Sequence, residues 1–116
     1  MKDSFKIKSK LAKNVNSDPK DVLLTKEVLY KLGHYKIPDY GLTVYPDKQL
    51  FEGIGKFQKD NGLPITQSLD PGDDTETEIA GRSPIMRCTN CGAPHAGVKG
   101  KLCPQCYGKL FGPIFG

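Results

Sequence analysis

Four cysteines in the C-terminal third of the chain carry the clearest chemistry in the sequence. Cys88 and Cys91 are separated by two residues, and Cys103 and Cys106 repeat this spacing after an interval of eleven residues. A Cys-x2-Cys turn brings two thiolates to one ion from a single loop, and two such turns supply the tetrahedral sulfur shell that Zn²⁺ prefers. Because four thiolates leave no open position for water, the spacing predicts a structural zinc ion and not a catalytic one.

The residues around the cysteines suit this interpretation. Asn90 and Gly92 near the first pair, and Pro104 and Gly108 near the second, let the backbone curl until its N–H groups point at sulfur. Two disulfides in a secreted chain are the alternative, but two-residue loops make poor staples. His95 follows the first pair and could replace a thiolate as ligand. Since four sulfurs already suffice, we expect it to be a loop histidine.

Length and composition exclude several classes of protein. A chain of 116 residues with 37% hydrophobic residues and no Trp can bury only a modest core. No apolar run approaches the 18 or so residues of a membrane span, and the N-terminus lacks the apolar region of a secretory signal. Thiols reserved for a metal suit a reducing compartment. The chain as encoded is therefore predicted to be cytoplasmic.

The net charge of +4 comes from the two ends of the chain. Residues 1–20 and 83–116 are basic, whereas residues 21–82 carry more acidic than basic side chains. Four thiolates and one Zn²⁺ would lower the charge of the cysteine module further. Nucleic-acid binding also needs exposed aromatics beside a basic groove, and this module offers few. Nucleic acid is therefore not the expected partner.

The chain is predicted to divide near residues 80–86, because residues 80–84 are small or polar and include Gly81 and Pro84, as linkers do. We therefore divide the chain into a basic N-terminal arm (1–14), a helical domain (15–82) and a four-cysteine zinc-binding module with an apolar tail (83–116). The expected fold class is mainly α, with three helices and a small C-terminal zinc ribbon.

Two amphipathic helices are predicted with clear boundaries. The first begins at Asp18-Pro19, an N-cap followed by proline at the first helical position, and stops at Gly33. Its apolar side is expected to face the core. The opposite side is expected to face solvent and carries Lys20, Lys26, Glu27 and Lys31. The second begins at Pro46-Asp47 and ends at Asn61-Gly62, with an apolar stripe of Leu50, Ile54 and Phe57.

A third, shorter helix is predicted from Asp73-Asp74 through Ile79, because carboxylates favour a helix N-terminus. These paired carboxylates are therefore expected to be helix-start residues and not catalytic acids. Gly53-Ile54-Gly55 lacks the strand and spacing of a phosphate loop and is expected to allow close helix packing. No nucleophile stands with a base and an acid in a plausible arrangement, so no enzymatic activity is predicted.

The order of these features resembles the peptidoglycan-binding-like domain, a three-helix module of cell-wall hydrolases and phage proteins. The resemblance covers about residues 15–81, and three pieces carry it: Leu32-Gly33, Phe57-Gln58-x3-Gly62-Leu63 and Asp70-Pro71-Gly72-x2-Thr75. Thr66-Gln67 stands where the family often has Asp-Gly, and Asp73-Asp74 replaces the usual Gly-Pro. The cysteine module separately resembles a zinc ribbon or a rubredoxin-type pair of knuckles.

The resemblance implies structural roles for its signature residues. Phe57 is expected in the core, Gln58 on the backbone of the neighbouring loop, and Thr75 at the third helix. Ligand contacts would come from exposed aromatic rings, which suit sugars, and from polar groups near helix ends, which suit peptide stems. The candidates are Tyr35, Tyr40, Asp60 and Asn61.

Two functions follow as expectations. The first is non-catalytic binding of bacterial cell-wall peptidoglycan, or of a protein that handles it, with zinc stabilising the second module. The second is a phage or bacterial adaptor whose zinc ribbon grips a protein or nucleic acid. A wall-binding protein must reach the wall, and a phage source or excision from a longer exported protein would reconcile this with the absence of a signal. A third alternative is a helical domain that kept the fold and lost the wall ligand.

Overall fold

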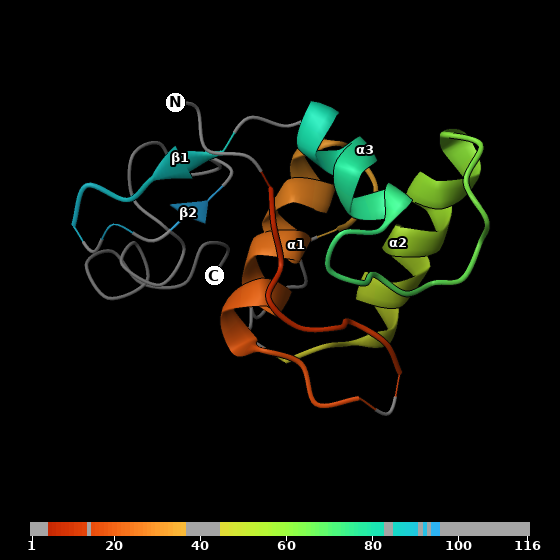
Figure 1. The fold of residues 1–116 in the computed structure, drawn as a ribbon, viewed down its shortest axis with the longest axis horizontal. Helices are drawn as coiled ribbons and strands as arrows, with labels where there is room; N and C mark the ends of the chain where they lie inside the picture. Colours follow the sequence, from red (N-terminus) through yellow and green to blue (C-terminus); the bar gives the residue numbers. More distant parts are fainter. Residues whose placement is uncertain are drawn as a thin grey trace.

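The computed structural model describes residues 5–13, 15–36, 45–82, 85–90, 92 and 94–95. Within them it contains three helices and one short pair of antiparallel strands: α1 (Pro19–Lys31), α2 (Lys48–Asp60), α3 (Asp74–Arg82), β1 (Met86–Arg87) and β2 (Pro94–His95). Helix α1 contacts both α2 and β2, so it lies at the centre of the described structure (Figure 1). The prediction of a mainly helical fold with three helices is confirmed.

The first two helices begin where the capping residues predict. Asp18 accepts a hydrogen bond from the Lys20 backbone N–H (2.8 Å), and Pro19 occupies the first helical position. Asp47 caps α2 in the same way, accepting from the Leu50 backbone N–H at 2.7 Å. Gly33 follows α1 with φ +86°, a conformation that only glycine adopts without strain.

Helix α3 also begins as predicted but ends three residues later, at Arg82 instead of Ile79. Asp73 is its N-terminal cap, with Oδ1 accepting from the Glu76 backbone N–H at 2.7 Å. The last turn is stabilised by Arg82, whose Nη2 lies 2.9 Å from Glu78 Oε1 one turn earlier. Residues 80–82, assigned to the linker from their composition, therefore belong to the helix.

The middle of helix α1 is covered on every side, which corrects the prediction of a solvent-facing charged side there, whereas Lys20 and Lys31 at its two ends are exposed as predicted. Nine consecutive residues, 21–29, are buried, and at 100° per residue they sweep all faces of a helix. Lys26 and Glu27, predicted to face solvent, are fully buried. Both side chains are buried by segments outside α1, which the periodicity of α1 cannot predict.

The N-terminal segment is part of the core and not a separate basic arm over residues 5–13. Phe5, Ile7 and Leu11 are buried with the side chains of the helices, while the lysines between them are exposed. This alternation has the period of an extended chain with one covered face. The prediction overlooked it because the lysines dominate the composition.

Hydrogen bonds fix this segment to two helices. Glu76 of α3 accepts from the Ile7 backbone N–H at 2.9 Å. Asp21 of α1 accepts from the N–H groups of Lys8 and Ser9, both at 2.9 Å. The Leu11 and Leu69 backbones then exchange two hydrogen bonds, at 2.8 and 2.9 Å. The N-terminal segment therefore closes the core between α1 and α3.

Close packing explains the two glycines in α2. A Cβ atom at Gly53 would lie 2.5 Å from the backbone oxygen of His34, and one at Gly55 would lie 2.9 Å from Cγ of Gln67. The chain after α1 thus passes directly against α2. The prediction of close packing at these glycines is confirmed, but their closest neighbours are His34 and Gln67, in the segments after α1 and after α2, and not another helix.

Candidate functional site

The first cysteine pair begins at the end of a two-residue hairpin strand. Strands β1 and β2 pair in antiparallel register, Met86 with His95 and Arg87 with Pro94. Cys88 follows β1 directly and is 4% exposed. The turn that follows is also held by Arg87, whose Nη1 donates to the Gly92 backbone oxygen at 3.1 Å. The hairpin therefore directs this thiol into a confined turn.

The turn has the geometry expected of a metal knuckle. The Asn90 backbone N–H donates to Cys88 Sγ at 3.4 Å, and the Gly92 backbone N–H donates to the Cys88 carbonyl oxygen at 2.9 Å. Gly92 has φ +76°, which lets the chain reverse at this point. An N–H aimed at sulfur stabilises the thiolate relative to the thiol. The described part of the turn thus fits a zinc-bound cysteine.

The other three predicted ligands, Cys91, Cys103 and Cys106, lie outside the described residues. Among the residues that are described, no group of three or more metal-binding side chains is found. The zinc site therefore stays a prediction, supported by the Cys88 turn.

The sequence suggested that His95 lies in a loop, and this prediction is wrong. His95 is on β2, opposite Met86, and is fully buried. Burial of its ring follows from the position of β2 against α1, which the spacing of cysteines does not encode.

Tyr35 is not an exposed ring available to a sugar. It is 6% exposed, belongs to the hydrophobic core, and donates a hydrogen bond from its hydroxyl to Asp47 Oδ2 at 3.1 Å. The segment just after α1 lies close against α2 at Gly53, which places Tyr35 in the core. Tyr40, the other tyrosine proposed as a ligand contact, lies outside the described residues.

Asp60 and Asn61 do lie together, at the C-terminal end of α2. The Asp60 side chain is 64% exposed, and its Oδ2 lies 2.9 Å from His34 Nε2. The His34 ring in turn meets Phe57 edge-on, with centroids 5.5 Å apart. Asn61 donates from Nδ2 to the Phe57 carbonyl oxygen at 2.8 Å, which satisfies the end of the helix. Asp60 is therefore the more accessible of the two for a ligand.

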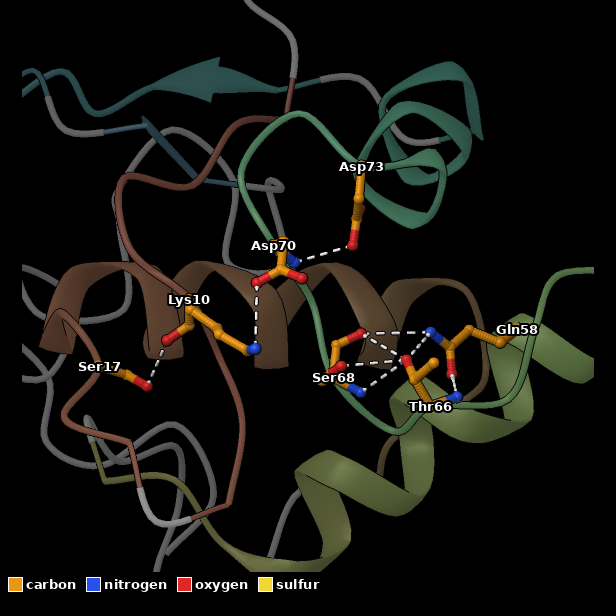
Figure 2. A network of polar contacts seen from close by, with 7 residues as sticks. All are labelled: Lys10, Ser17, Gln58, Thr66, Ser68, Asp70 and Asp73. Atoms are coloured by element: carbon orange, nitrogen blue, oxygen red, sulfur yellow. Dashed lines mark hydrogen bonds and ion pairs between the residues drawn. The ribbon is translucent and has the colours of Figure 1, made fainter.

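Gln58 has the role predicted for it. Its side chain is buried, and Oε1 accepts from the backbone N–H groups of Thr66 and Gln67, both at 3.0 Å. Its Nε2 donates to Thr66 Oγ1 at 2.9 Å and to the Ser68 carbonyl oxygen at 3.2 Å (Figure 2). One amide thus fixes the loop after α2, where Gln67 has φ +56°.

The same amide reaches the third helix, because Nε2 lies 3.1 Å from Thr75 Oγ1. Thr75 is 5% exposed, so its hydroxyl braces α3 from within the core, as expected. Phe57, beside Gln58, is fully buried, and its core role is also confirmed. These signature residues act on the fold and present no group to a ligand.

The polar contacts continue from this loop to the N-terminal segment (Figure 2). The Asp70 backbone N–H donates to Asp73 Oδ2 at 2.8 Å, and Asp70 Oδ1 lies 3.8 Å from Lys10 Nζ. The Lys10 carbonyl oxygen accepts from Ser17 Oγ at 2.9 Å. Sequence reasoning missed these links because it set residues 1–14 apart from the helical domain.

Lys26 was also missed as a buried cation. Its Nζ donates to the Tyr45 carbonyl oxygen and lies 3.4 Å from Asp47 Oδ2. Burial lowers the pKa of the Lys26 ammonium below its usual 10.5, and the nearby Asp47 carboxylate opposes this shift without cancelling it. The Asp47 carboxylate thus caps α2, accepts a hydrogen bond from Tyr35, and forms an ion pair with Lys26 of α1.

Comparison of the chain with protein-family models found no match, and comparisons with curated proteins and with solved structures found no significant similarity. Among the described residues, no helix is long and apolar enough to cross a bilayer.

Proposed function

We propose that this chain is a non-catalytic binding protein whose C-terminal module holds one structural Zn²⁺ through Cys88, Cys91, Cys103 and Cys106. The observation that carries the metal proposal is the hydrogen bond from the Asn90 N–H to Cys88 Sγ, at 3.4 Å. A bound zinc ion would cross-link two loops that have too few apolar residues to fold unaided.

The ligand proposed for the helical domain is bacterial peptidoglycan, or a protein that handles it. Support comes from the resemblance together with the contacts of its signature residues: Gln58 joins the loop after α2 to Thr75 of α3, and Gly62 has φ +71° at the stop of α2. A phage source or a longer exported parent would bring such a domain to the wall.

Asp60 is the proposed contact for the ligand. Its exposed carboxylate, with Asn61 beside it, can accept hydrogen bonds from the hydroxyls of a glycan and from the amines of a stem peptide. His34 holds one carboxylate oxygen at 2.9 Å, which fixes the direction of the group. Preorganisation of this kind lowers the entropic cost of binding.

Co-sedimentation of the full chain with purified insoluble peptidoglycan tests the proposal. We expect retention that survives added salt, weakened in Asp60→Asn and unchanged in Asp74→Asn, which alters an exposed carboxylate at the start of α3. Absence of retention would contradict wall binding. Binding to DNA or RNA that weakens steeply with salt would favour the adaptor instead.

A further inference from the structure

The cover of α1 comes from two directions. Val22, Leu24, Val28 and Leu29 pack into the hydrophobic core of the helical domain. Leu23 is also buried, at 7% exposed, but within the described residues it is not a member of that core cluster. A second layer of chain must therefore cover the side of α1 turned away from the core.

The metal module supplies part of that layer. Strand β2 contacts α1, and in Figure 1 the β1–β2 pair lies on the side of α1 opposite α2. His95 of β2 is fully buried. Ile85, three residues before Cys88, is 8% exposed and belongs to the core of the helical domain. The hairpin is thus packed against the helical domain and tied into its core.

We infer that the zinc ion fastens this second layer over α1, so that metal binding and the stability of the helical domain are thermodynamically coupled. The inference rests on the proposed zinc site and goes beyond it, because zinc bound to an independent module would not change the stability of the helices. A ligand that binds only the folded state stabilises that state. Release of the hairpin would uncover the part of α1 that β2 contacts.

Coupling of this kind is reciprocal, so a change on α1 that weakens the packing of the hairpin must also weaken the affinity for zinc. Leu23 is not a metal ligand, and it lies on α1, whereas the metal module begins only after the end of α3. Its truncation therefore probes the coupling without touching sulfur.

Hydrogen exchange of the zinc-loaded full chain, before and after removal of the metal by a chelator, tests the inference. We expect the amides of α1 to exchange at least about tenfold faster after chelation, with a smaller change in α2. Verified loss of zinc with unchanged exchange in α1 would overturn the coupling while leaving the zinc site intact. A chain that binds no zinc at all would overturn both proposals.

Two variants supply a second readout. Leu23→Ala should weaken zinc affinity, measured by competition with a chelator of known affinity, by about tenfold. The control Ile65→Ala removes an apolar side chain that is 58% exposed and should leave the affinity unchanged. Equal zinc affinity in the folded Leu23→Ala variant and in the wild type would contradict the inference.

Discussion

The backbone nitrogen of Asn90 lies 3.4 Å from the sulfur of Cys88 and donates a hydrogen bond to it. The same turn closes through the Gly92 N–H and the Cys88 carbonyl oxygen, at 2.9 Å. Two donors from one short loop thus hold the cysteine, one on its side chain and one on its backbone. A thiolate gains more from such a donor than a thiol does, which is what a metal ligand requires.

Removal of this donor should weaken metal binding. Asn90→Pro lacks the backbone N–H, and we expect its zinc affinity to fall about 10- to 100-fold, the usual effect of losing a group that supports a metal ligand. Asn90→Ala keeps the N–H and is the matched control, with affinity close to that of the wild type. Competition with a chelator measures both, and equal affinities would show that the hydrogen bond is unimportant.

A methyl group at Gly53 should destabilise the fold. The added Cβ would lie 2.5 Å from the His34 carbonyl oxygen, so the segment after α1 must move away from α2. We expect the free energy of unfolding to fall by about 1–3 kcal/mol. Gly81→Ala in α3 meets no atom within 4 Å and should stabilise by up to about 1 kcal/mol. Urea denaturation distinguishes the two, and similar values for both variants would disprove the close contact.

Gln58→Glu tests the buried amide. The variant replaces an NH₂ donor by oxygen, which places a carboxylate against the Ser68 carbonyl oxygen, 3.2 Å from the present nitrogen. We expect a loss of about 2–4 kcal/mol in unfolding free energy at neutral pH. The difference from the wild type should shrink in acid, because a protonated carboxyl can again donate.

Gln49→Glu, at an exposed position of α2, provides the control for this change of charge and should be close to neutral. A loss in Gln58→Glu no larger than that of the control would mean that the contacts of Gln58 do not stabilise the loop.

The buried Lys26 should give an alkaline pH dependence. Burial lowers its pKa in the folded state below the ordinary 10.5. Between these two values the unfolded chain binds a proton that the folded chain does not, so the free energy of unfolding rises with pH. The slope for one proton is at most about 1.4 kcal/mol per pH unit.

The measurement is the difference in unfolding free energy between the wild type and Lys26→Met, followed upward in pH toward the ordinary lysine pKa of 10.5. We expect the wild type to gain relative to the variant, because only the wild type carries this titration. A difference that stays constant or falls would show that the pKa of Lys26 is not lowered in the folded state.

Capping chemistry made the helices predictable. Asp18, Asp47 and Asp73 each accept a hydrogen bond from a backbone N–H two or three residues later, so these contacts can be predicted from the local sequence. The core role of Phe57 followed from the apolar stripe of its helix, whereas the loop contacts of Gln58 were implied by the family resemblance. The end of α3 was not predicted, because residues 80–82 are small or polar yet continue the helix.

Contacts between distant segments could not be predicted from periodicity. Asp21 lies in the first turn of α1, and its carboxylate also accepts hydrogen bonds from the backbone of the N-terminal segment, a contact that its position in the helix does not predict. Tyr35 was expected to be exposed and is instead a core residue that bonds Asp47. Burial of Lys26 likewise depends on the chain near Tyr45, nineteen residues away. The zinc ligand set was proposed from spacing alone, and the structure adds the shape of one turn.

The zinc content of the purified full chain tests the central claim most directly. Mass spectrometry under native conditions should find one zinc ion per chain in the wild type and none in Cys88→Ser, because three thiolates and a hydroxyl bind zinc far less tightly than four thiolates. A wild-type chain that carries no zinc after exposure to the metal, or that keeps it when Cys88 is replaced, would contradict the account.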